Sequence, residues 1–395
     1  MSNGILVVNA GSSSLKVSVH HRFAGSIQPA LHGHVEAIGK VPRFHARDAG
    51  GNDIDTQGVV TGREVDHAAV LDRLLDWLQE RTQGLTLQAA GHRIVHGGSR
   101  FADAVRLKSD VLRDLDALAP LAPLHQPHNL APVRALWRRS PDLPQVACFD
   151  TAFHRTQPEI AQHFALPRPL TEEGIRRYGF HGLSYEYIAQ VLPEYAGAAA
   201  NGRVVVAHLG HGASMCALRN GRSIATTMGF TALDGLPMGK RCGDLDPGVV
   251  LYMLQEKGWS AKDVEETLYH RSGMYGVSGL SDSMQDLLES SATQAEEAVA
   301  LFCYRANREL GSLVAALGGL DVLVFTAGIG EHAPEIRRRI CAQASWLGIS
   351  VDPDANDENA TIISSADSRV SVHVIPTDEE QIIAQHTARL CNVRA

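Results

Sequence analysis

One short pattern, an apolar strand followed by a glycine-rich turn and a second strand, occurs twice in this chain, about half its length apart. The first copy covers residues 5–19, with its turn at 9–14, and the second covers residues 204–218, with its turn at 208–214. An apolar run, a tight turn and a second short strand-like segment together predict a β-hairpin. Two hairpins of the same kind at equivalent places predict a duplicated fold.

A third strand followed by glycines occupies residues 322–331 and runs into a predicted helix over 334–346. A strand, a glycine turn and a helix N-terminus together form an arrangement that binds anions. The stretch Gly328–Gly330 also matches a dinucleotide-binding pattern through Ala333, with Asp352 further along the chain. A dehydrogenase therefore stays an alternative for this segment.

Helical patterns alternate with these strands, which predicts an α/β fold. A chain of 395 residues is longer than one hydrophobic core usually supports, so we expect two domains. The first is predicted over residues 1–150 plus about 376–395, and the second over 151–375. Amphipathic helices are predicted at 66–81, 171–177, 246–257, 261–270 and 295–317.

The bulk properties exclude several classes of protein. A net charge of -8 and a pI of about 6.2 give no general attraction to nucleic acid or to an anionic membrane surface. The six cysteines form no C-x-x-C pair, which argues against a zinc site or a disulfide framework. The first residues lack the features of a signal peptide, and no apolar run is long enough to span a membrane. We therefore expect a cytoplasmic protein.

The chain has no P-loop for binding phosphates. The nearest string, residues 235–241, has the wrong spacing and lacks Ser or Thr after its lysine. The first hairpin offers another phosphate site, because Gly11 and the serines after it supply amides and hydroxyls, with Asn9 and Lys16 beside them. An ordinary polar hairpin tip is the alternative interpretation.

Two arginines are flanked by glycines, in segments that do not have the sequence of a hydrophobic core. Arg93 precedes a pair of glycines in GHRIVHGG, and Arg241 lies in MGKRCGDLDPG. A guanidinium binds the two oxygens of a carboxylate or phosphate at once, which makes both residues candidates for an anion site. A surface ion pair of little energetic value is the alternative for each.

Several further polar residues occupy positions where catalytic groups are often found. Asp150 follows the apolar run 146–149, where a strand of an α/β sheet ends, although it also fits the N-cap of a following helix. His125, His154 and His181 stand beside glycines, prolines or aromatic residues. A structural role remains the alternative for each histidine.

Acidic residues cluster near the C-terminus, where residues 375–381 read IPTDEEQ. This segment is typical of a capped helix start. Its carboxylates are also ligands that Mg²⁺ accepts.

Nine strings, in this order along nearly the whole chain, resemble those of the acetate kinase family. This resemblance implies a duplicated ribonuclease-H-like (actin-like ATPase) fold with a cleft between its domains, and a homodimer. It implies reversible phosphoryl transfer from ATP to acetate, giving ADP and acetyl phosphate by direct in-line displacement with Mg²⁺ or Mn²⁺. The strings are ILVVNAGSSSLK, GHRIVHGG, LAPLHQP, FDTAFH, YGFHG, HLGHGAS, RCGDLDPG, FTAGIGE and IPTDEE.

The resemblance also implies roles for individual residues. Asn9 and Glu379 would help to bind the metal, with Glu380 as the alternative ligand, and Arg93 would hold the acyl substrate. Asp150 would orient or deprotonate the carboxylic acid, and because acetate is ionised at neutral pH, orientation is the expected role. The phosphates would be held by Ser12, Ser14 and Lys16, and the transition state stabilised by Arg241, His125 and His181.

The implied nucleotide site departs from the family pattern at four positions. His211 and His332 stand where the family usually has asparagine, and Ser283 and Gln285 replace an acid and an arginine. The departures raise the hypothesis of altered donor recognition. The residues expected around the nucleotide are His208, Leu209, Gly210, His211, Gly212, Ser283, Met284, Gln285, Gly328, Ile329, Gly330, Glu331 and His332.

The implied acyl pocket contains Val95, Leu124, Phe180 and Ala232. Ala232 stands where the family usually has proline, and its smaller side chain predicts room for propionate with modest discrimination. A propionate or other short-chain acyl kinase is therefore an alternative. A nucleotide-binding sensor without catalytic activity is the alternative from another class.

Overall fold

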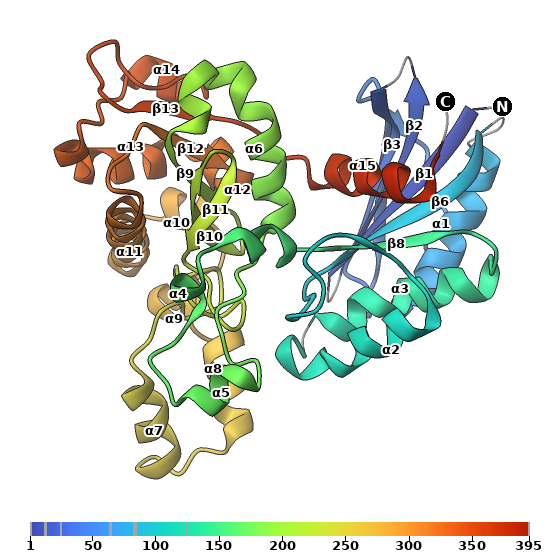
Figure 1. Ribbon diagram of the computed structural model, residues 1–395, viewed down its shortest axis with the longest axis horizontal. Helices are drawn as coiled ribbons and strands as arrows, with labels where there is room; N and C mark the ends of the chain where they lie inside the picture. The colour runs from blue at the N-terminus through green and yellow to red at the C-terminus, as the bar shows by residue number, and fades with distance from the viewer. Residues whose placement is uncertain are drawn as a thin grey trace. The chain divides into compact units, whose positions relative to one another are not determined.

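The computed structural model of the protein describes residues 2–11, 14–23, 26–62, 65–81, 85–123 and 125–393 (Figure 1). The chain divides into two compact units, one made of Met1–Phe153 with Asp378–Ala395, and the other of His154–Thr377. Two of the predicted site residues, Ser12 and Leu124, lie outside the described residues.

The first unit is built on an eight-stranded sheet with the order β5-β4-β3-β2-β1-β6-β8-β7. Strands β1 to β3 form an antiparallel meander, whereas β6 runs parallel to β1, and β8 parallel to β6. The strands are β1 (Ser2–Ala10), β2 (Leu15–Phe23), β3 (Ser26–Glu36), β4 (Arg43–Asp48), β5 (Asp53–Ile54), β6 (Leu85–Ile94), β7 (Val105–Arg106) and β8 (Gln145–Phe149).

Helices cover both faces of this sheet. On one face, the leucines of α1 pack with alternate residues of β1, such as Leu6 and Val8, in one hydrophobic core. The opposite face carries α15, where Ile383 and Thr387 contact Gly91 of β6. The helices of this unit are α1 (His67–Arg81), α2 (Ser109–Ala117), α3 (Gln126–Arg139) and α15 (Glu379–Cys391), with a short 3-10 turn at Ala119–Leu121.

The second unit is built on a five-stranded sheet with the order β11-β10-β9-β12-β13. Strands β9 to β11 form an antiparallel meander, whereas β12 runs parallel to β9, and β13 parallel to β12. The strands are β9 (Arg203–Leu209), β10 (Ala213–Arg219), β11 (Arg222–Thr226), β12 (Val322–Thr326) and β13 (Ser371–Val374).

Most helices of the protein belong to this second unit. The longest, α11, contributes buried residues such as Phe302 and Leu310 to its core. The helices are α4 (Glu159–Gln162), α5 (Arg168–Glu172), α6 (Gly182–Ala196), α7 (Pro247–Gln255), α8 (Ala261–His270), α9 (Gly273–Ser278), α10 (Met284–Glu289), α11 (Thr293–Leu317), α12 (Ala327–His332), α13 (Pro334–Gln343) and α14 (Pro353–Asp357), with 3-10 turns at Gly197–Asn201 and Ser345–Leu347. A further 3-10 turn, Ala152–Thr156, includes the last residues of the first unit and the first of the second.

The strand orders confirm the duplication that the two hairpins predict. The central strands β3-β2-β1-β6-β8 of the first sheet and β11-β10-β9-β12-β13 of the second follow the same order and the same directions. In each unit a three-stranded meander is therefore extended by two parallel strands. Among the described residues, β12 is followed by one further strand, β13, whereas the βαβαβ half of the dinucleotide-binding alternative requires two, so the topology contradicts that alternative.

The predicted helices are found with one exception. The helix predicted at 171–177 is wrong, because α5 ends at Glu172 and Gly174 then takes a left-handed conformation with φ of 97°. Helix α7 matches the prediction in position but buries none of its residues, so its apolar side is not part of the core of the chain. Among the described residues, no helix has both the length and the apolar character needed to cross a membrane.

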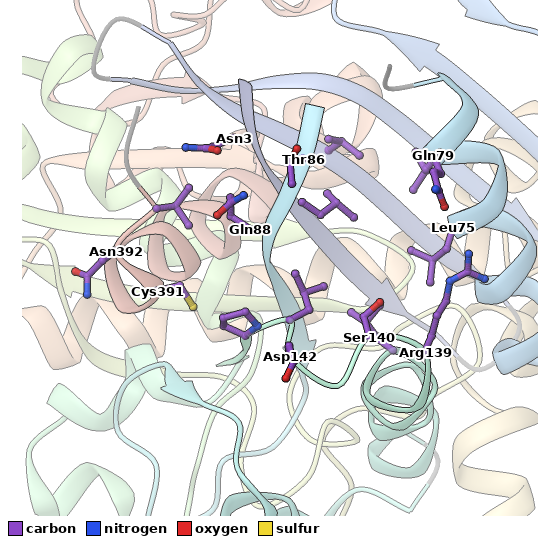
Figure 2. A pocket seen from close by; sticks show the side chains of 17 residues that line it. Asn3, Leu75, Gln79, Thr86, Gln88, Arg139, Ser140, Asp142, Cys391 and Asn392 are labelled. Atoms are coloured by element: carbon purple, nitrogen blue, oxygen red, sulfur yellow. The ribbon is translucent and has the colours of Figure 1, made fainter. Parts of the chain in front are cut away.

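A hollow of about 870 Å³ lies at the edge of the first sheet where β1 and β6 begin (Figure 2). Asn3 and Thr86 mark these strand starts and line the hollow. Asn9 and Arg93, by contrast, lie at the other ends of the same strands. This hollow is therefore separate from the predicted site residues.

Candidate functional site

The predicted site residues of the first unit gather where its parallel strands end. Asn9 is near the end of β1, Arg93 near the end of β6, and Asp150 follows β8 directly. Side chains alternate between the faces of a strand, so Arg93 shares the face of Gly91, which packs against α15. Glu379 is the first residue of α15 and completes the cluster from that face.

Arg93 is the centre of this cluster. Its Nε and Nη2 donate to the two carboxylate oxygens of Asp150 at 2.9 and 2.6 Å, and its Nη1 donates to Oδ1 of Asn9 at 3.2 Å. A carboxylate oxygen of Glu379 lies 3.8 Å from Nε. Burial lowers the pKa of Arg93, but the charges of Asp150 and Glu379 outweigh it and raise the pKa, so the guanidinium stays charged.

The three acids at the start of α15 have different partners. Asp378 is the N-cap, where its side chain accepts a hydrogen bond from the amide of Gln381 at 2.8 Å, as the capped-helix interpretation predicts. Glu380 pairs with Nδ1 of His32 at 3.0 Å. Burial raises the pKa of Glu380, but hydrogen bonds with His32 and Ser18 outweigh it, and the pKa is lowered.

Asn129, which the sequence did not single out, holds the ends of two strands together. Its Oδ1 accepts from the amide of Val95 at 2.9 Å, and its Nδ2 donates to the carbonyl of Ala10 at 2.6 Å. It therefore fixes the segments beside Asn9 and Arg93. A polar residue on a helix gives no sequence signal for such a contact.

The phosphate turn of the first hairpin is described in part. The amide of Gly11 donates to the carbonyl of Ser14 at 2.9 Å, and Lys16 pairs with Asn9 across the hairpin. Lys16 also lines a groove of about 820 Å³ with His34 of β3. His125 is at the N-cap position of α3.

In the second unit, Arg241 and His181 border the same glycine. A Cβ atom added to Gly212 would lie 2.7 Å from Nη2 of Arg241 and 3.3 Å from Nε2 of His181. Nη1 of Arg241 donates to the carbonyl of Ala232 at 2.6 Å, so the loop around Ala232 holds the guanidinium. Nη2 of Arg241 and Nε2 of His181 thus border the space beside Gly212 that a larger residue would fill with its side chain.

The turn of the second hairpin is supported by α6. His208 Nδ1 is 2.8 Å from Oγ of Ser184, and its ring stacks on that of His181 with centroids 4.2 Å apart. Nδ1 of His181 is 2.8 Å from Oγ of Ser214, which in turn is 2.5 Å from the hydroxyl of Tyr185. The sequence did not point to these three hydroxyl residues as parts of the site.

The segment Gly328–Glu331 is a helix, α12, and the predicted glycine turn is therefore wrong. The change of direction after β12 takes place at Ala327, which has a left-handed φ of 65°. The carboxylate of Glu331 accepts hydrogen bonds from the amide of Ala327 at 2.7 Å and from the amide of Thr377 at 3.2 Å. This carboxylate thus stabilises the bend and holds the last residue of the unit.

The four departures from the family pattern have described contacts. Nε2 of His211 is 3.0 Å from a carboxylate oxygen of Asp282, which Lys240 also approaches at 3.4 Å. Asp282 is adjacent in sequence to Ser283, whose side chain caps α10. The contact of His211 is thus with the residue that precedes Ser283. The other departures are Gln285, which donates to Glu289 at 2.9 Å, and His332, whose side chain is largely exposed.

The residues expected in the acyl pocket belong to different units. Val95 is buried in the first unit, whereas Phe180 is buried and Ala232 half-buried in the second. His154 has a structural role, since its ring nitrogens pair with the carbonyl of Phe180 and with Ser223. Burial lowers the pKa of His154 to about 4, so its ring is neutral.

The predicted metal site in the first unit offers oxygen atoms as ligands. Asn9 and Glu379 contact the same arginine and supply a carboxamide and a carboxylate oxygen, which suit Mg²⁺. Within the part of the chain that the structure describes, no group of three or more His, Cys, Asp or Glu side chains is arranged to hold a metal ion.

The repeated sheets, with charged residues at the ends of the parallel strands, define a duplicated α/β protein of the actin-like ATPase fold. Comparison with solved structures supports this class. A propionate kinase from Francisella tularensis matches with a TM-score of 0.91 at 35% identity, covering 98% of this chain and 100% of that one. The acetate kinase of Porphyromonas gingivalis matches with a TM-score of 0.86 at 34% identity, covering 98% and 99%.

Sequence comparison identifies the family. The model of the acetokinase family matches residues 4–385. An acetate kinase of Rhodopseudomonas palustris is 54% identical over 397 aligned positions, which cover 99% of both chains. The chain belongs to the acetokinase family, and the resemblance found from its motifs is confirmed.

Proposed function

We propose that this protein catalyses reversible phosphoryl transfer between ATP and acetate. A carboxylate oxygen of acetate attacks the γ-phosphorus in line, a new oxygen–phosphorus bond forms, and the bond to the bridging oxygen of ADP breaks. The products are acetyl phosphate and ADP. Acetate is already ionised at neutral pH, so this step needs no proton transfer.

The arrangement around Arg93 carries this proposal. A guanidinium has five N–H donors, and the bonds to Asp150 and Asn9 use three of them. The two others lie on the terminal nitrogens and fit the two oxygens of a carboxylate. Asp150 therefore orients Arg93 toward acetate, and we assign it this positioning role rather than proton abstraction.

Arg241 and His181 supply the donors for the transferred group. Their nitrogens border Gly212, whose missing side chain leaves room for phosphoryl oxygens. Hydrogen-bond donors that are already in place stabilise the charge on these oxygens in the transition state. His125 is proposed to join them.

Magnesium fits the oxygen atoms of Asn9 and Glu379. When bound, the ion would neutralise phosphate charge. Glu379, rather than Glu380, is the proposed ligand, because Glu380 is held by His32 and Glu379 lies beside Arg93. Ser12, Ser14 and Lys16 would contact the phosphates from the first hairpin.

The second unit is the proposed nucleotide side, through His208–Gly212, Ser283–Gln285 and Gly328–His332. The contact of His211 with Asp282 supports altered recognition of the base or ribose. We expect GTP, another triphosphate or pyrophosphate to replace ATP with comparable efficiency. Efficient turnover with ATP alone would contradict this part of the proposal.

Propionate is the second candidate acceptor. The propionate kinase of Francisella tularensis shares the fold of this chain, and Ala232 is smaller than the proline usual in the family. One methylene group changes binding in such a pocket by about 1–3 kcal/mol, so discrimination should be modest. If propionate gives less than about a hundredth of the acetate efficiency, Ala232 does not widen the pocket.

The proposed assembly is a homodimer. Helix α7 supports it, because the helix is rich in apolar residues and buries none of them. Leu251 and Tyr252 are 52% and 55% exposed there, which a second copy of the chain would cover. The proposed location is the cytoplasm, and the free state of all six cysteines fits it.

The test is acyl-phosphate formation, trapped as a hydroxamate, across nucleotide donors and short carboxylic acids. Arg93→Ala and Arg241→Ala should each lower kcat/KM by about a hundredfold or more, because each removes a charged donor from the transition state. Arg43→Ala is the control, since Arg43 is exposed and distant in sequence from the cluster. Nucleotide binding without any acyl phosphate would favour a sensor instead.

A further inference from the structure

Two buried hydroxyl groups hold His181 from the side of its Nδ1 atom. Oγ of Ser214 is 2.8 Å from this nitrogen and 2.5 Å from the hydroxyl oxygen of Tyr185. Ser214 and Tyr185 are both fully buried. His181 is the N-cap of α6, Tyr185 lies one turn along the same helix, and Ser214 comes from β10. The three groups therefore form a chain from the core to the ring.

The direction of hydrogen bonding in this chain follows from the acidity of its members. Burial raises the pKa of Tyr185 well above its usual value, so the phenol keeps its proton at neutral pH. A phenol is a stronger donor than an aliphatic alcohol, and the alcohol oxygen is the better acceptor. Tyr185 therefore donates to Ser214, and Ser214 gives its single proton to Nδ1 of His181.

An imidazole whose Nδ1 accepts a hydrogen bond carries its own proton on Nε2. In His181 this Nε2 borders Gly212 together with Nη2 of Arg241. The positive charge of the neighbouring Arg241 guanidinium disfavours a positive charge on the imidazole ring of His181. The close stack on His208, with an angle of 18° between the rings, also suits a neutral imidazole.

We propose that Ser214 and Tyr185 are positioning residues that hold His181 as the neutral tautomer with its proton on Nε2. In this state Nε2–H and the guanidinium of Arg241 are two donors directed at one anion. The inference rests on the proposed function in one respect, because it takes that anion to be the transferred phosphoryl group.

The tautomer is measured directly by long-range proton–nitrogen correlation NMR on protein with ¹⁵N-labelled histidine, using His181→Gln to assign the signal. We expect a protonated Nε2 and an unprotonated Nδ1 in the intact protein. In Ser214→Ala the signal should move toward a mixture of tautomers. A protonated Nδ1 in the intact protein would overturn the proposal.

Kinetics give the second readout. Ser214→Ala should lower kcat about tenfold, with KM for ATP and acetate changed less than about twofold, because His181 acts mainly in the transition state. Tyr185→Phe should have a smaller effect in the same direction, since Ser214 still donates to the ring. Ser214→Thr retains the hydroxyl and should recover most of the lost rate.

Ser223→Ala is the matched control. Ser223 is also a buried serine of the second sheet bonded to a histidine, His154, at 2.9 Å, but that histidine has a structural role. It should change neither kcat nor the His181 signal. An equal loss of kcat in Ser214→Ala and Ser223→Ala would overturn the positioning role. An unchanged kcat in Ser214→Ala would also overturn it.

The NMR readout also separates this inference from the proposed function, because it needs no turnover. If Ser214→Ala does not fold, Tyr185→Phe carries the test through the tautomer signal and kcat. The expected tautomer in a protein without acyl kinase activity would leave the positioning intact and refute the proposed reaction. An active enzyme with the other tautomer would refute only the positioning.

Discussion

Ala327 is the residue where local strain and the proposed site meet. It has a φ of 65° although it is not glycine, and it makes the bend between β12 and α12. A left-handed conformation costs a residue with a side chain roughly 1–2 kcal/mol. The hydrogen bond from its amide to the carboxylate of Glu331 offsets part of this cost.

Replacing Ala327 by glycine therefore has an unusual expected result. We expect Ala327→Gly to leave the free energy of unfolding unchanged or to raise it by up to about 1 kcal/mol. Ala300→Gly, at an exposed position within α11, should instead lower it by about 1 kcal/mol. Urea unfolding of both variants measures this free energy. If both variants lose the same free energy of unfolding, Ala327 is not strained.

Sequence reasoning was most successful for charged residues that follow strands. The glycines around Arg93 indicated an anion site, the apolar run before Asp150 placed that residue at a strand end, and the two are found in one hydrogen-bonded cluster. Ser214 and Asn129 were missed because their partners lie far away in sequence. A hydroxyl or amide gives no sign of such a partner before the chain folds.

At the scale of elements, the contact between β6 and α15 positions Glu379. Gly91 allows the helix to approach, because a Cβ atom there would lie 2.2 Å from Oγ1 of Thr387 and 2.6 Å from a methyl group of Ile383. The start of α15 carries Glu379 toward Arg93. The glycine thus links packing to the geometry of the cluster.

Gly91→Ala should lower the free energy of unfolding by about 1–3 kcal/mol, as expected for overpacking. It should also lower kcat/KM, because α15 must shift. Urea unfolding and the hydroxamate assay measure both effects. Gly311→Ala in α11 is the control, since its Cβ would meet only an ordinary contact at 3.8 Å and helix propensity favours alanine. Wild-type stability in Gly91→Ala would refute the close contact.

The start of β12 provides a pH-dependent element. Asp321 accepts hydrogen bonds from the backbone and side chain of Arg203 on β9, and these lower its pKa below the usual 3.8 despite an opposing effect of burial. A lowered folded-state pKa means that the stabilisation is present above 3.8 and is lost as the pH falls through the folded-state value.

Asp321→Asn should therefore be less stable than the unmodified protein at neutral pH, and the difference should shrink in acid. Urea midpoints measured across this range test the sign. A difference that grows as the pH falls would contradict the account. Asp354→Asn, at an exposed residue of α14, is the comparison.

The elements themselves were predictable to different degrees. Helix α8 was predicted with the correct bounds, since its period and its Ser260 cap agree. The short α5 was misplaced, because Gly174 ends the helix where the apolar pattern continues. The glycines 328–330 suggested a turn, but the bend occurs one residue earlier, at Ala327.

At the scale of the whole molecule, the duplicated sheets explain why the two hairpins recur. Each unit repeats a meander followed by two parallel strands, and the strand ends of each carry donors or carboxylates. The duplication itself was predicted from the hairpin pattern. The exposed apolar surface of α7 was not, because a sequence period shows that a helix has an apolar side but not what covers it.

The double variant Leu251→Glu with Tyr252→Glu should convert the proposed dimer into a monomer, because it buries charge in the apolar contact. Sedimentation velocity measures the mass. Trp346→Glu, at an exposed apolar residue outside α7, should leave the dimer intact. A dimer that survives the double variant would exclude α7 as the contact.

The central claim is that a carboxylate oxygen of acetate attacks the phosphorus of the donor, and oxygen isotopes test it directly. With acetate labelled with ¹⁸O at both oxygens, ATP and Mg²⁺, the account predicts acetyl phosphate whose bridging oxygen is ¹⁸O, seen as an isotope shift of its ³¹P signal. Acetyl phosphate without ¹⁸O bound to phosphorus, or no acetyl phosphate with any donor, would contradict it.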